Sequence, residues 1–201
     1  FIIFFCFCTL HVKLVFSQSL ETVINSKNRT SNYIERDKYR NPLETLNFFK
    51  IKNNMKVIEL QPSGGNSPGG WYTEILAPYL KKEGKLIAAH FNPNESKWRE
   101  KMRRGFEERI KKNADFKNIE MSVLSMPPTK LTIDNSVDMV LTFRNLHNWL
   151  KAGYLEEVFK VSYDALKPGG IFGVVEHRAP SNFSIKDMNK TGYVTEELAI
   201  D

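Results

Sequence analysis

The chain has 201 residues, of which 41% are hydrophobic and 26% charged, and its net charge is +6. This length is enough to bury a sizeable core, so one domain is the default expectation. The basic residues form no dense cluster, and no nucleic-acid partner is expected. Both cysteines, Cys6 and Cys8, lie near the start, which excludes disulfides, a cysteine nucleophile and cysteine-ligated zinc from the rest of the chain.

The chain begins with the apolar run "FIIFFCFCTLHVKLVF", which is followed by a plausible cleavage site after Ser17. This pattern resembles the apolar region of a secretory signal. We therefore expect residues 1–17 to be a partial signal peptide or anchor. The protein would then be exported, periplasmic or secreted, and would touch a membrane only through this segment if it stays uncleaved. The alternative is that the run forms a first strand or helix of the fold, in a cytoplasmic protein.

Residues 18–40 are polar and charged with few apolar positions, and they are expected to form a linker or loose N-terminal arm. The stretch "NPLETLNFFKI" then predicts a short helix, because Asn41 is a favourable cap and Pro42 suits the first helical position. This helix precedes the first predicted strand.

From there on, apolar strands alternate with helices. Strands are predicted at 56–60, 85–91, 118–125, 136–146 and 171–180, and helices at 71–82, 96–112 and 150–166. Within the last helix we expect four side chains to face inward, namely Leu155, Val158, Phe159 and Tyr163. This order predicts an α/β, Rossmann-like, doubly wound and mostly parallel sheet with helices on both faces, over residues 41–201.

Ligands of such sheets bind at the carboxyl ends of the strands, beside the point where strand order reverses. Four strands carry the following residues at these ends, all of them polar except Phe143: Glu59; His90 and Asn92; Phe143, Arg144, Asn145, His147 and Asn148; Glu176, His177 and Arg178. Strands that are apolar in the middle and polar at one shared end predict a site at that rim.

The glycine-rich loop "ELQPSGGNSPGGWYTE" follows the first strand. Gly65 and Gly70 have the spacing of a triphosphate-binding loop, but Trp71 stands where that loop needs a lysine. The G-x-G-x-x-G pattern of dinucleotide sites is also absent, so NAD remains a minority alternative. S-adenosylmethionine has no phosphate, and an acid after strand one with polar residues after strand two suits it in outline.

Four stretches occur in the order and spacing of a class I S-adenosylmethionine-dependent methyltransferase: "VIELQPSGGNSPGGWYTEILAPYL", "KLIAAHFNP", "VDMVLTFRNLHNWL" and "ALKPGGIFGVVEHRA". The chain resembles this superfamily over residues 40–201, and within it a group of bacterial predicted methyltransferases that often carry an export signal. It departs from the pattern at Gln61 and Ser63, where glycines are usual, and at His90, where an acid is usual. The two last strands of such domains are missing, so a fragment is expected.

The resemblance implies a set of cofactor-binding residues: Glu59, Gly64, Gly65, Gly69, Gly70, Trp71, His90, Asn92, Phe143 and Arg144. It also implies candidate catalytic residues, which are His147, Asn145, Glu176 and His177. Among these, His147 is the best general base, since an imidazole titrates near neutrality. It could equally be a histidine that bonds loop backbone. No metal is expected.

The expected function is therefore methyl transfer from S-adenosylmethionine, by direct displacement, to an unidentified small-molecule acceptor. Two alternatives remain open. One is an exported Rossmann-like protein that binds a small molecule without catalysis. The other is an NAD-dependent oxidoreductase.

Overall fold

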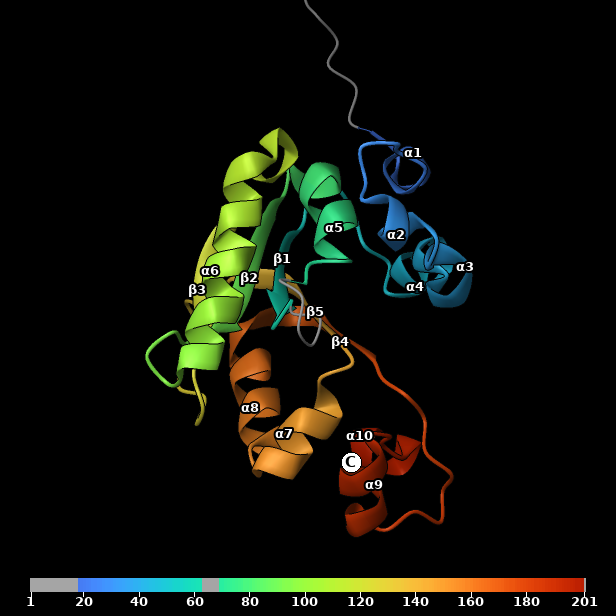
Figure 1. The fold of residues 1–201 in the computed structure, drawn as a ribbon, viewed down its shortest axis with the longest axis vertical. Coiled ribbons are helices and arrows are strands. Elements are labelled where there is room, and N and C mark those ends of the chain that lie inside the picture. The colour runs from blue at the N-terminus through green and yellow to red at the C-terminus, as the bar shows by residue number, and fades with distance from the viewer. Residues whose placement is uncertain (1–17, 63–68, 201) are drawn as a thin grey trace, which may run out of the picture.

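The computed structural model describes residues 18–62 and 69–200 and has the expected α/β architecture (Figure 1). Its sheet contains five parallel strands in the order β3-β2-β1-β4-β5. The strands are β1 (Lys56–Leu60), β2 (Lys85–Phe91), β3 (Glu120–Leu124), β4 (Val137–Phe143) and β5 (Leu166–Val175). The strand order reverses between β1 and β4, so the Rossmann-like fold class is confirmed. The predicted signal segment and the loop glycines Gly64 and Gly65 lie outside the described residues.

Helices cover both faces of the sheet (Figure 1). The later helices are α4 (Pro42–Phe48), α5 (Thr73–Leu80), α6 (Lys97–Lys112), α7 (Leu146–Ala152), α8 (Leu155–Ala165), α9 (Ile185–Thr191) and α10 (Glu196–Ile200), with a 3-10 turn at Ala114–Phe116. Among the helices built from residues 18–62 and 69–200, none combines the length and apolar character needed to cross a bilayer.

Two apolar cores lie on opposite faces of the sheet. Successive residues of β4 alternate between them, with Met139 and Leu141 in the core shared with α5, and Val140 in the core shared with α7 and α8. All three are completely buried. Because successive side chains alternate between two faces that are both buried, each position of such a strand is apolar. This explains why the strands appear in the sequence as continuous apolar runs.

The prediction of a single helix over residues 150–166 is wrong, because Gly153 interrupts it. This residue has a φ of 75° and ends α7 in the left-handed conformation, with its N–H bonded to the carbonyl of Leu150 at 3.1 Å. Helix α8 then begins at Leu155 in a new orientation. Its Tyr163 is 79% exposed rather than turned inward, whereas Val158 is buried as expected.

The segment expected to be a loose arm is folded. It forms α1 (Leu20–Ile24), α2 (Ser31–Ile34) and α3 (Asp37–Arg40), and Leu20, Val23 and Ile24 join the core beside α5. Arg29, only 5% exposed, donates to both Asp37 carboxylate oxygens, at 2.6 and 2.9 Å, and to the Ile24 carbonyl at 2.8 Å. Buried hydrogen bonds hold these helices in place. Hydrophobic periodicity gives no signal for such contacts, so the sequence pattern did not predict the helices.

A buried carboxylate, Glu74, anchors this segment to the sheet domain. It accepts hydrogen bonds from the backbone N–H of Thr30, at 3.0 Å, and from the Thr30 hydroxyl. It also forms an ion pair with Arg109 of α6. Arg109 in turn donates to the Gly69 carbonyl and lies 4.9 Å from the Tyr33 ring centroid. We call these contacts around Glu74 and Arg109 the clamp.

Replacing Glu74 by glutamine tests the clamp. The substitution keeps the shape and removes the charge, which leaves Arg109 without its buried partner. We expect the free energy of unfolding to fall by about 2 kcal/mol, measured by urea denaturation. The control is Glu108→Gln on the exposed side of α6, for which no change is expected. Equal effects in the two variants would contradict a stabilising clamp.

Candidate functional site

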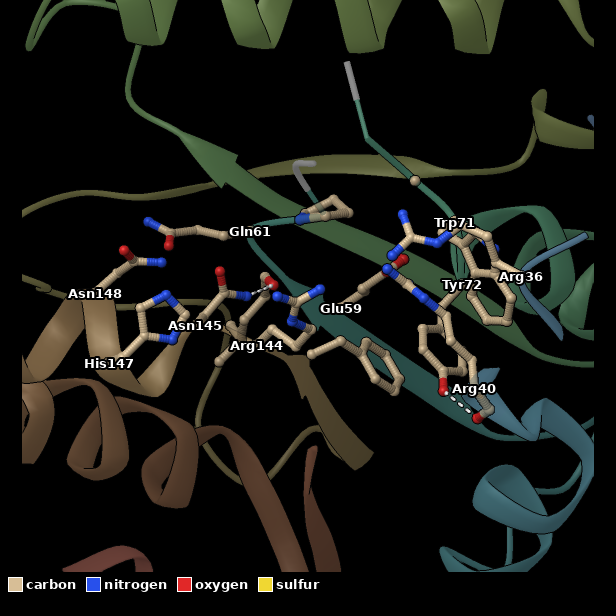
Figure 2. A pocket seen from close by; sticks show the side chains of 14 residues that line it. Arg36, Arg40, Glu59, Gln61, Trp71, Tyr72, Arg144, Asn145, His147 and Asn148 are labelled. Atoms are coloured by element: carbon tan, nitrogen blue, oxygen red, sulfur yellow. Dashed lines mark hydrogen bonds between the residues drawn. The ribbon is translucent and has the colours of Figure 1, made fainter. Parts of the chain in front are cut away.

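A cavity of about 450 Å³ opens at the carboxyl ends of β1 and β4, where strand order reverses (Figure 2). Four segments contribute to it, namely the N-terminal helices, the end of β1, the start of α5 and the β4–α7 connection. Its lining residues are Arg36, Arg40, Glu59, Leu60, Gln61, Pro62, Gly70, Trp71, Tyr72, Phe143, Arg144, Asn145, His147 and Asn148. This position is the one expected from the topology.

Glu59, the next-to-last residue of β1, is the one acid of this lining, and it is 2% exposed. Its Oε2 accepts a hydrogen bond from the Thr73 hydroxyl at 2.6 Å. Burial raises the pKa of Glu59 to about 7, although the Thr73 hydrogen bond and the positive charge of Arg109 oppose that shift. Near neutral pH this carboxyl therefore gains or loses a proton easily, according to the charge placed beside it.

The predicted departure at Gln61 is accommodated by a specific bond. Gln61 has a φ of 43°, in the left-handed region that favours glycine. Its N–H donates to the Ala89 carbonyl at 2.8 Å, and its Oε1 accepts from the Trp149 indole N–H at 2.9 Å. These bonds hold a glutamine where a glycine is usual, and they place its amide between the end of β1 and α7.

Gly70 occupies a backbone position that favours glycine. Its φ is 82°, and an added Cβ would lie 3.0 Å from Phe106, 3.1 Å from Arg109 and 3.2 Å from the Thr73 hydroxyl. The preceding Gly69 also has a positive φ, of 79°, and its carbonyl accepts from Arg109. The glycines thus allow the chain to pass tightly between α5 and α6.

Aromatic side chains form one wall of the cavity. Trp71, 6% exposed, donates its indole N–H to the Tyr33 carbonyl at 2.9 Å. The Tyr72 and Phe143 rings are stacked, with centroids 3.5 Å apart and planes 11° apart. Trp71 and Phe143 therefore lie where the sequence predicted them, in a largely apolar and rigid wall.

The β4–α7 connection brings two predicted residues into the cavity. Arg144 has a φ of 63°, and its N–H donates to the Val175 carbonyl at 2.7 Å. The Asn145 amide donates to the Leu60 carbonyl at 3.2 Å and to the Thr142 hydroxyl at 3.1 Å. Asn145 thus ties together the two strand ends at the reversal of strand order.

His147, the candidate base, lines the cavity and is oriented by Glu176 behind it. Its Nδ1 lies 2.9 Å from the Glu176 carboxylate, which also accepts the backbone N–H of His177 at 2.8 Å. Burial raises the pKa of Glu176, but the hydrogen bonds from His147 and His177 outweigh burial and leave that pKa below its ordinary value. An ionised Glu176 holds the His147 proton on Nδ1 and leaves Nε2 as an acceptor.

His177 itself does not line the cavity. Its ring stacks on Tyr193, with centroids 4.9 Å apart. Burial lowers its pKa, and the positive charge of Arg144 acts in the same direction. Of the candidate catalytic residues, Asn145 and His147 therefore line the cavity. Glu176 lies behind His147, and His177 lies outside the cavity lining.

His90 and Asn92 lie at the end of β2, but their side chains do not line the cavity. The His90 ring is completely buried beside Phe91 and Phe106, and its Nδ1 accepts the Phe91 N–H at 2.9 Å. Its Nε2 has no hydrogen-bond partner. Burial lowers the pKa of His90 to about 4, so the ring is neutral. Asn92 accepts a hydrogen bond from the N–H of Asn94, and neither side chain lines the cavity.

A second cavity, of about 350 Å³, adjoins the first and shares Gln61, Asn145 and Asn148 with it. The other lining residues are Phe91, Trp98, Arg99, Met126, Trp149 and Ala152. Trp98 lies 5.1 Å from the Phe91 ring centroid and is 46% exposed. The Trp98 indole belongs to α6 and lies beside the end of β2, where it offers a flat apolar surface. The sequence placed this residue within the predicted helix 96–112 and gave it no site role.

Six lining residues of the first cavity were missed by sequence reasoning: Arg36, Arg40, Leu60, Gln61, Pro62 and Tyr72. The two arginines come from the segment expected to be a loose arm, and no local pattern marks them. Tyr72 falls within the predicted helix 71–82, and Gln61 was identified as a departure from the glycine pattern. In the part of the chain that the structure describes, no three potential metal ligands come together.

The raised pKa of Glu59 predicts a pH-dependent stability. The folded state binds the proton more tightly than the unfolded chain does, so stability from this group is fully present below pH 4.5 and is lost as pH rises through about 7. Relative to Glu59→Gln, the wild type should lose about 3 kcal/mol of unfolding free energy between pH 4.5 and pH 8. Urea denaturation at both pH values checks this. A difference between the two proteins that does not change with pH would contradict it.

No family model matches the sequence, and no curated protein does either. Solved structures do match. The PH0226 protein from Pyrococcus horikoshii OT3 is similar over 77% of this chain, with a TM-score of 0.51 and 19% identity. The CcbJ methyltransferase from Streptomyces caelestis (TM-score 0.48, 15% identity) and coclaurine N-methyltransferase (TM-score 0.49, 13% identity) are also similar.

The chain spans 60% of the PH0226 chain, 47% of CcbJ and 42% of coclaurine N-methyltransferase. At such identities the likeness is one of fold. These structures confirm the predicted Rossmann-like α/β fold.

Proposed function

We propose that this protein binds S-adenosylmethionine and transfers its methyl group to a small-molecule acceptor. The observation that carries the proposal is the pair of connected cavities at the reversal of strand order, with a buried acid at the end of β1 and an exposed indole beside the end of β2. Phosphate-binding features are missing from the same loop, which favours a cofactor without phosphate.

The residues of the two cavities fit the parts of this cofactor. Glu59 accepts the Thr73 hydrogen bond through Oε2, and a nearby ammonium or sulfonium would favour its ionised carboxylate. Trp98 and Phe91 offer an apolar surface for the adenine. Asn145, which lines both cavities, would lie between the two ends of the cofactor.

Bound S-adenosylmethionine supplies a methyl group on a sulfonium, which is a good leaving group. The chain then needs to align an acceptor and exclude water. The stacked pair of Tyr72 and Phe143 forms a rigid wall against which an acceptor can be positioned. His147, with Nδ1 held by Glu176, takes the acceptor proton on Nε2.

Ligand binding tests the proposal directly. At a ligand concentration 100 times the dissociation constant, S-adenosylhomocysteine should stabilise the chain by about 2.7 kcal/mol, because it binds only the folded state. Thermal unfolding with S-adenosylmethionine, S-adenosylhomocysteine and NAD provides the measurement. Stabilisation by NAD alone would favour an oxidoreductase, and no stabilisation by the two sulfur compounds would overturn the proposal.

Replacing Trp98 by alanine tests the position of the adenine. Loss of the indole should weaken S-adenosylhomocysteine binding about tenfold or more, measured by isothermal titration calorimetry. Since Trp98 is 46% exposed, the fold should tolerate the change. The control is Tyr163→Ala, which removes an exposed aromatic ring from α8, away from both cavities. Unchanged affinity in Trp98→Ala would place the adenine elsewhere.

A further inference from the structure

Three arginines line the first cavity: Arg36 and Arg40 from the N-terminal helices, and Arg144 from the end of β4 (Figure 2). Most other arginines near the core have acidic partners; Arg29 pairs with Asp37 and Arg109 with Glu74. Within residues 18–62 and 69–200, by contrast, no carboxylate forms an ion pair with any of the three. The cavity thus concentrates positive charge that the surrounding protein does not neutralise.

The arginines are close enough to affect one another. Burial lowers the pKa of Arg40, and the charges of Arg36 and Arg144 lower it further, while Tyr72 raises it. The Arg40 guanidinium lies over the Trp71 ring, 4.7 Å from its centroid, and this contact fixes the group without using its N–H donors. An oxyanion bound among these guanidinium groups would accept hydrogen bonds from them and offset the repulsion between their charges.

The cofactor alone does not balance this charge. S-adenosylmethionine carries a sulfonium, an ammonium and one carboxylate, so its carboxylate can pair with one guanidinium while its net charge stays positive. Glu59 is the one acid that lines the cavity, and in the proposed function it faces the cationic part of the cofactor. At least two guanidinium groups are left for another anion.

We propose, on the basis of the methyl-transfer function above, that the acceptor is an anion and that its carboxylate or phosphate group is held by Arg36, Arg40 and Arg144. The anionic group would anchor the acceptor beside the aromatic wall of Tyr72 and Phe143, with its nucleophilic atom toward His147. Arg36 and Arg40 would bind the anion from the N-terminal segment, and Arg144 would bind it from the end of β4.

Oxyanion binding to the S-adenosylhomocysteine-saturated chain tests this inference. Inorganic phosphate and succinate are titrated by calorimetry, and succinamide serves as the uncharged analogue of succinate. We expect at least one of the two anions to bind and succinamide not to bind, because the guanidinium groups act on charge. The stronger of the two anions identifies phosphate or carboxylate as the recognised group. Binding of neither anion, or equal binding of succinamide, would overturn the inference.

Variants assign the binding to the arginines. Arg36→Gln, Arg40→Gln and Arg144→Gln should each weaken binding of the anion about tenfold. At least two of the three variants should keep their affinity for S-adenosylhomocysteine, because the cofactor carboxylate pairs with no more than one guanidinium. Arg104→Gln is the matched control, because it removes the same charge from an exposed position on α6. An equal loss in Arg104→Gln would reveal a general charge effect and contradict the assignment.

Two further outcomes separate this inference from the proposed function. If the three variants lose S-adenosylhomocysteine affinity and keep anion affinity, the arginines hold the cofactor carboxylate and the inference is wrong. If S-adenosylhomocysteine does not bind the wild type at all, the methyl-transfer proposal fails. The same anion titrations on the ligand-free chain then decide whether the arginines form an oxyanion site.

Discussion

The clamp around Glu74 and Arg109 is the interaction on which the site depends. It joins three parts of the chain that are far apart in sequence: the loop before α2, the start of α5 and the last turns of α6. Because Arg109 also donates to the Gly69 carbonyl, the clamp holds the end of the glycine loop together with the N-terminal helices. Without it, one side of the first cavity would lose its support.

The charge distribution of the site follows from where each group is buried. Glu59 lies at the end of a central strand, where burial favours its neutral form. Two of the arginines come from the N-terminal helices and the third from the end of β4, and no described carboxylate forms an ion pair with them. A cavity with a partly protonated acid and three guanidinium groups is suited to ligands that bring in both a cation and an anion. A cationic cofactor and an anionic acceptor together meet this requirement.

The sequence predicted the sheet well, because strands buried on both faces are apolar without interruption and their ends are marked by polar residues. Phe143 and Asn145 were placed at the rim of the sheet for this reason, and the structure has both in the cavity lining. Arg36 and Arg40 could not be, since their position results from the clamp and from the Arg29–Asp37 ion pair, which are long-range or polar contacts. His90 was misplaced because strand position alone does not tell which face of the sheet a side chain occupies.

The chain contains three tryptophans, Trp71, Trp98 and Trp149, and each lines one of the two cavities. Trp149 is 1% exposed and bonded to Gln61, Trp71 lies beneath an arginine, and Trp98 is 46% exposed. Their indole emission therefore originates entirely from the site. The molecule carries its own optical reporter of occupancy, in which a ligand in the second cavity should perturb the solvent-exposed indole most strongly.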